Sequence, residues 1–120
     1  MARVAALIPD LLFGSRVQGA LVQGGHEVAL VGSAEAAARD GLAGADVLVI
    51  DLAGPGVDGV AVLERLRDGG GLEGVRTLAT YSHVDADMRR RALEAGFDLV
   101  VPRSRMVRDG AGLLAELAAA

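Results

Sequence analysis

The chain contains no cysteine, no tryptophan and no lysine. Without cysteine, disulfide bonds, thiolate metal ligands and thiol catalysis are excluded. All twelve basic residues are arginine, so the chain can offer neither a Schiff base nor the lysine of a Walker-type phosphate loop. The aromatic residues are only Phe13, Tyr81 and Phe97. These are too few for the base-stacking surface of a single-stranded nucleic-acid binder.

The 120 residues nevertheless carry enough apolar material for one domain with a sizeable core. Hydrophobic residues make up 52% of the chain and the mean hydropathy is +0.39, which excludes a disordered protein. A net charge of −4 argues against general nucleic-acid binding. No apolar run approaches the roughly 18 residues of a membrane span, and Pro9 stops the first one too early for a signal peptide. We therefore expect a cytoplasmic protein with no membrane partner.

Five apolar segments alternate with stretches of helical spacing. The predicted strands are Val4–Ile8, His26–Val31, Val47–Ile50, Val75–Thr80 and Leu99–Val101. The predicted helices are marked by Val17, Leu21 and Val22; by Ser33 and Glu35–Ala38; by Val60, Leu63 and Leu66; by Met88, Ala92 and Leu93; and by Leu113, Leu114 and Leu117. Strands that alternate with helices form a parallel sheet covered on both faces. Since five strands do not close a barrel, we predict one α/β domain over residues 1–120, an open doubly wound sheet of (βα)5 type with the flavodoxin-like strand order 2-1-3-4-5.

Polar residues follow the predicted strands at the sheet edge where such folds bind ligands. Asp10 follows the first strand and Asp51 the third, and these two strands are neighbours in a doubly wound sheet. The two acids are expected to face each other across a shallow acidic pocket. Close carboxylates need a cation or a proton between them, and oxygen ligands in small number suit Mg²⁺. A simpler interpretation is that each acid caps a helix or forms a turn.

Two further strand ends reach the same edge. Tyr81, Ser82 and His83 follow the fourth strand, and Arg103 follows the fifth. His83 is expected to be solvated or to tune the pocket. His26 precedes the second strand and is expected at the surface, too far from His83 to form a metal pair.

The stretch from Asp46 to Arg67, DVLVIDLAGPGVDGVAVLERLR, resembles the central part of response-regulator receiver domains. In that family an aspartate at the end of the third strand accepts a phosphoryl group from a histidine kinase, and a Pro-Gly-x-Asp-Gly turn follows, here residues 55–59. Arg91–Asp98 (RALEAGFD) is similar to the Ala-Leu-Glu-Ala-Gly-Ala-Asp stretch of the family. The glycines 54, 56 and 59 also match a dinucleotide fingerprint, but that fingerprint belongs on the first strand of such a fold, so we interpret them as turn residues.

The resemblance implies roles for individual residues. Asp51 would accept the phosphoryl group, and Mg²⁺ would be held by Asp10, Asp51 and the carbonyl of Ala53. Pro9 stands where the family usually has a second acid, and Val100 stands where it has its switch aromatic.

Two more departures concern the residues that contact the phosphoryl group in the family. Tyr81 stands at the position of a small hydroxyl residue, for which Ser82 or Thr80 is a substitute. Arg103 stands at the position of a lysine, and its planar fork is not interchangeable with a compact ammonium group.

The sequence therefore leaves two functions open. One is a stand-alone atypical receiver in a two-component phosphorelay, with Asp51 as phosphoacceptor and Arg103 as the phosphoryl clamp. The other is a pseudo-receiver in which Arg103 neutralises the acids permanently and the fold is an interaction module. A remote third reading is a small-molecule or nucleotide-binding domain. None of these readings makes the chain a dedicated enzyme.

A basic segment marks a predicted partner surface. Residues 85–108 carry six arginines against four acids, a local charge of +2; the arginines are Arg89, Arg90, Arg91, Arg103, Arg105 and Arg108. Within the helix, Asp85–Arg89 and Asp87–Arg91 are spaced for i,i+4 ion pairs. In receivers the face of helix 4, strand 5 and helix 5 binds partners, so a histidine kinase or a downstream protein with an acidic surface is expected here. Nucleic acid is not expected, and dimerisation through this face stays open.

Overall fold

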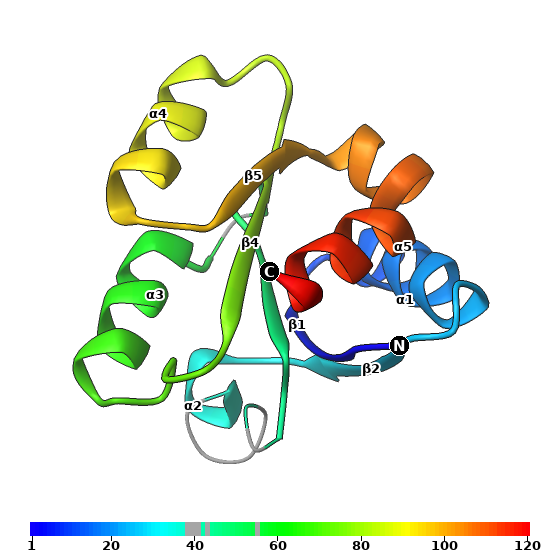
Figure 1. The fold of residues 1–120 in the computed structure, drawn as a ribbon. Helices are drawn as coiled ribbons and strands as arrows, with labels where there is room; N and C mark the ends of the chain where they lie inside the picture. The colour runs from blue at the N-terminus through cyan, green and yellow to red at the C-terminus, as the bar shows by residue number, and fades with distance from the viewer. Residues whose placement is uncertain (38–41, 43, 55) are drawn as a thin grey trace.

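Five parallel strands form the centre of the molecule, in the order β2-β1-β3-β4-β5. Figure 1 shows this computed structural model, which describes residues 1–37, 42, 44–54 and 56–120. The strands are β1 Arg3–Leu7, β2 Glu27–Val31, β3 Val47–Asp51, β4 Arg76–Tyr81 and β5 Leu99–Pro102. Each predicted strand is therefore correct to within one residue at either end, and the predicted fold class and strand order are confirmed. Ala38 of the predicted second helix and Pro55 of the turn lie outside the described residues.

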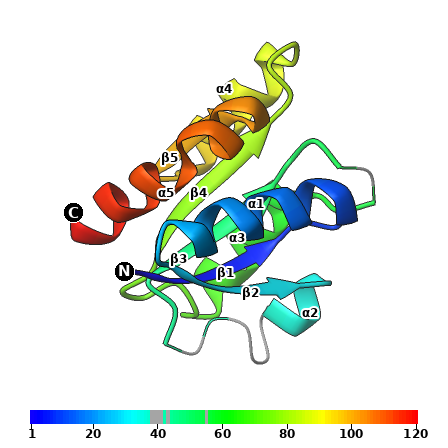
Figure 2. The same cartoon turned by 90° about the vertical axis from the view of Figure 1, so that its right-hand side faces the viewer.

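Helices cover both faces of the sheet (Figures 1 and 2). The helices are α1 Leu11–Gln23, α2 Ala34–Ala36, α3 Gly59–Asp68, α4 Ala86–Ala95 and α5 Arg103–Ala119. An aspartate stands at the N-cap of three of them, where its carboxylate accepts a hydrogen bond from the backbone N–H three residues on: Asp10, Asp58 and Asp85. None of the helices in the described part of the chain has the length and apolar character of a membrane span.

Two apolar cores lie on opposite sides of the sheet. Val17 and Leu21 of α1 pack with Leu114 of α5 on one side, and Leu63 of α3 packs with Ala92 of α4 on the other. All five residues of β3 are buried, because this central strand is covered on both faces. Two residues predicted to lie on buried helix faces do not: Val22 is 53% exposed and Leu93 is 46% exposed.

His26 is buried, which corrects the prediction that it lies at the surface. The residue is 5% exposed, and its ring connects the N-terminal segment to α5. The Ala2 N–H donates to His26 Nδ1 at 2.9 Å, so Nε2 carries the proton and donates to the Ala111 carbonyl, also at 2.9 Å. A Cβ added at Gly24 would lie only 2.4 Å from the Ala111 Cβ, so the α1 end and α5 approach closely beside this ring. The ring is buried because both its nitrogens have backbone partners.

Candidate functional site

Asp51 is the last residue of β3 and is fully enclosed. Its side chain is 0% exposed, and a Cβ added at Gly54 would lie 3.5 Å from Asp51 Oδ2, so the loop after β3 passes over the carboxylate. Oδ1 accepts hydrogen bonds from the Thr80 hydroxyl at 2.9 Å and from the Ala53 N–H at 3.3 Å. Through the bond from the Ala53 N–H, Asp51 also forms a turn, as expected if it has a purely structural role.

Arg103, the first residue of α5, occupies the space between the two acids. Its Nε donates to Asp51 Oδ1 at 3.1 Å, and its Nη2 donates to Asp51 Oδ2. Its Nη1 donates to Asp10 Oδ2 at 3.3 Å. The guanidinium also lies over the Phe13 ring, with Cζ 4.3 Å from the ring centroid, so a cation–π contact adds to the ion pairs. The hydrogen bond to Asp51 raises the pKa of Arg103, although burial opposes this.

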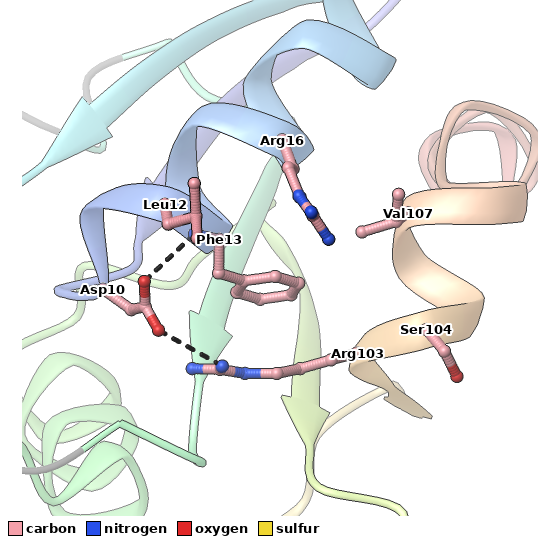
Figure 3. Close-up of a pocket in the computed structure, with 7 residues that line it drawn as sticks. All are labelled: Asp10, Leu12, Phe13, Arg16, Arg103, Ser104 and Val107. Carbon is pink, nitrogen blue, oxygen red and sulfur yellow. Dashed lines mark hydrogen bonds and ion pairs between the residues drawn. The ribbon is translucent and has the colours of Figure 1, made fainter.

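Asp10 combines the two roles predicted for it. It caps α1 through Oδ1, which accepts the Phe13 N–H at 3.0 Å, and it pairs with Arg103 through Oδ2. Figure 3 shows both contacts. The pKa of Asp10 is lowered mainly by the Phe13 hydrogen bond and further by the Arg103 cation. Since its side chain is 37% exposed, water reaches this end of the cluster but not Asp51.

The hydroxyl beside Asp51 belongs to Thr80. Thr80 is paired with Asp51 across β3 and β4, and its side chain is 0% exposed. Tyr81, which counting along the chain places at the hydroxyl position, is the next residue of the strand and is 7% exposed. Successive side chains of a strand point to opposite faces, so Thr80 and Tyr81 cannot both face Asp51. Ser82 lies beyond the strand and accepts the Asp85 N–H through its carbonyl.

These residues do not fit a magnesium ion in this arrangement. Both oxygens of Asp51 and both oxygens of Asp10 are hydrogen-bond acceptors already, and the Arg103 guanidinium lies where a cation would bridge them. In the described part of the chain no three His, Cys, Asp or Glu side chains come together as a metal site. Mg²⁺ prefers octahedral oxygen ligands and water, and a guanidinium offers only donors.

The arginines of the predicted partner surface are exposed, but their ion pairs differ from the prediction. The i,i+4 pairs do not form within α4: Asp85 caps the helix through the Met88 N–H, and Asp87 pairs with Arg90 at 2.9 Å. On α5, Arg105 and Arg108 both lie near Asp109, at 3.9 and 3.2 Å. Because Asp109 lies one residue past the predicted segment, its charge lowers the net positive charge of this surface. The exposed arginines are Arg89, Arg90, Arg91, Arg105 and Arg108.

Known structures share this arrangement of strands and helices over their whole length. A receiver domain from Clostridium thermocellum superposes with a TM-score of 0.83 at 16% identity, covering 99% of this chain and 95% of its own. The receiver domain of the Francisella response regulator 1452 gives 0.81 at 15% identity, covering 99% and 98%. The chain has the fold of response-regulator receiver domains. No family model matches the sequence, and no curated protein does.

A third structure with this fold contains a metal. The receiver domain of the sensor histidine kinase PA1611 from Pseudomonas aeruginosa has a TM-score of 0.84 at 17% identity and covers 99% of this chain and 98% of its own. That protein carries a magnesium ion coordinated in its active-site cleft. The receiver-like chain described above has a guanidinium between its two acids instead.

Proposed function

We propose that this receiver-like chain is a phosphorylation-independent interaction module, a pseudo-receiver. The observation that carries the proposal is the position of Arg103, which forms two hydrogen bonds with Asp51 and one with Asp10. A permanent cation does here what a divalent metal ion does in a magnesium-dependent receiver, because it balances the negative charge of the two acids. The surface that binds the partner would then stay the same, because no phosphorylation changes it.

The enclosure of Asp51 supports this proposal from a second direction. A phosphoryl donor must bring a phosphorus atom to a carboxylate oxygen, but the Asp51 side chain has no exposed area. Thr80, Ala53 and Arg103 occupy its oxygens. Removing these contacts to admit a donor would leave a buried charge without partners, which is costly.

A second candidate is the atypical receiver, with Asp51 as phosphoacceptor. Asp10, Asp51, a hydroxyl and a cation do converge at one edge of the sheet, as the receiver resemblance implies. An Asp51 oxygen would attack the phosphorus of the donor. The bond from phosphorus to the leaving group, P–N in a phosphohistidine or P–O in acetyl phosphate, would break with its electron pair leaving on the departing nitrogen or oxygen. Arg103 would first have to leave Asp51, and Mg²⁺ would have to take its place between Asp10 and Asp51.

Intact-mass spectrometry after incubation with acetyl phosphate and MgCl₂ distinguishes the two candidates. We expect no added phosphoryl group on the wild-type chain, under conditions in which a magnesium-dependent receiver run alongside is modified. We also expect MgCl₂ to leave the thermal unfolding midpoint unchanged. A mass increase of one phosphoryl group that is lost in Asp51→Asn would contradict the pseudo-receiver and establish the second candidate.

The proposed output is contact with another protein in the cytoplasm. The exposed arginines of α4 and α5 favour a partner with an acidic surface, a histidine kinase or a downstream protein, and we propose no catalytic activity. Replacement of Arg89 and Arg91 by glutamine should slow association with such a partner, whereas Asp51→Asn should not.

A further inference from the structure

A cavity of about 440 Å³ lies between α1 and α5, beside the Asp10–Arg103 ion pair. Figure 3 shows its wall residues. Leu12 and Phe13 line it from α1, and Val107 lines it from α5. Its volume falls within the roughly 300–1,000 Å³ that small-molecule pockets occupy. Because Leu12 is 71% exposed, an apolar occupant would cover hydrophobic surface that water now contacts.

The cavity also receives the positive charge of Arg16. This arginine is the only charged residue in the thirteen residues of α1. It forms no ion pair or side-chain hydrogen bond with any described residue. In Figure 3 its guanidinium extends from α1 into the space between α1 and α5. A planar fork of this kind binds a carboxylate or sulfonate through two parallel hydrogen bonds.

The other charged groups at this cavity are already balanced. Arg103 is paired with Asp10 and Asp51, and the oxygens of Asp10 accept the Phe13 N–H and the Arg103 Nη1. The charges of Asp10 and Asp51 equal those of Arg16 and Arg103 in number. Both acids, however, are bound to Arg103 and not to Arg16. Among the described residues, an incoming anion would therefore meet Arg16 as the arginine without an acidic partner.

We propose that this cavity is a binding site for a small apolar organic anion. The anionic head is bound by Arg16, and the apolar body lies against Leu12, Phe13 and Val107. Asp10 and Arg103 line the same cavity, but the anion would bind to Arg16 whether or not Asp51 accepts a phosphoryl group.

The test is an NMR titration of the ¹⁵N-labelled chain with 2-naphthoate, with neither phosphoryl donor nor Mg²⁺ present. We expect saturable one-site binding that shifts the amide signals of Phe13, Arg16, Ser104 and Val107. The neutral analogue 2-naphthalenemethanol should bind about tenfold more weakly, as expected for the loss of a charge-assisted hydrogen bond.

Three variants make the result decisive. Arg16→Gln should raise the Kd for 2-naphthoate about tenfold. Arg65→Gln, which removes an exposed arginine on α3 at the opposite face of the sheet, should leave it unchanged. Val107→Trp should abolish binding by filling the cavity without changing charge. The proposal would be overturned if binding did not saturate, or if the amide signals that shift belonged to residues outside the cavity. An unchanged Kd in Arg16→Gln would overturn it as well.

Discussion

Two polar clusters hold the two ends of the sheet, one through charged groups and the other through a neutral ring. At the carboxyl ends of the strands, Arg103 binds Asp10 and Asp51 through charged groups. At the amino ends, His26 binds the Ala2 N–H and the Ala111 carbonyl through a neutral ring. Both clusters attach α5 to the rest of the fold.

The two clusters differ in what each could offer a ligand. The His26 ring has one acceptor and one donor, and its two backbone partners use both, so it has nothing left to offer a ligand. In the charged cluster a single cation, Arg103, balances two acids, and its Asp10 end is open to water. Burial of a polar residue alone does not mark a site, whereas convergence of exchangeable charges does.

The largest expected effect comes from breaking the charged cluster. Arg103→Ala leaves two acids without their cation, one of them fully buried, and should reduce the free energy of unfolding by about 3 kcal/mol. This value is at the low end for a buried pair because the Arg103 side chain is 27% exposed. Urea denaturation measures the loss, with Arg65→Ala as the control for an exposed arginine. A loss below about 0.5 kcal/mol, as for ordinary surface substitutions, would rule out permanent neutralisation by Arg103.

The neutral cluster should respond less strongly. His26→Ala leaves the Ala2 N–H and the Ala111 carbonyl without partners and should cost about 2 kcal/mol of unfolding free energy. His83 is exposed, so His83→Ala is the matched control and should change stability by less than about 0.5 kcal/mol. His26→Asn retains an acceptor near the position of Nδ1 and His26→Gln a donor near Nε2, so each should recover part of the loss. Equal unfolding midpoints for His26→Ala and His83→Ala would contradict the buried assignment.

The smallest effect concerns pH and Asp10. The pKa of this carboxyl is lower in the folded chain, chiefly through the Phe13 N–H and also through Arg103. Its stabilising contribution is therefore complete above its ordinary pKa and is lost as the pH falls below about 4 through the lower, folded value. Thermal unfolding between pH 5 and pH 2.5 should show a shallower loss of stability in Asp10→Asn than in wild type. Parallel curves for the two proteins would show that Asp10 is not coupled to folding in this way.

The fold and the converging acids were predictable from the sequence because they depend on local patterns. Apolar runs and helical spacing predict the ten elements, and the rule that parallel strands share a carboxyl edge brings Asp10, Asp51 and Arg103 together. The burial of His26 was not predictable, since its partners lie 24 and 85 residues away in the chain. Counting along the chain points to Tyr81 as the residue beside Asp51, whereas the structure has the Thr80 hydroxyl there. An error of one residue in such a count matters because neighbouring side chains of a strand lie on opposite faces of the sheet.

Tyr81 itself gives the protein an internal optical reporter. It is the only tyrosine and the chain has no tryptophan, so ultraviolet-excited emission comes from this one ring at the end of β4. The ring is 7% exposed, and Tyr81 is paired with Pro102, the residue before Arg103. We therefore expect a movement of Arg103 off the acids to change the emission of Tyr81 through the neighbouring Pro102. A change in its intensity on addition of a ligand would report such a movement without a label.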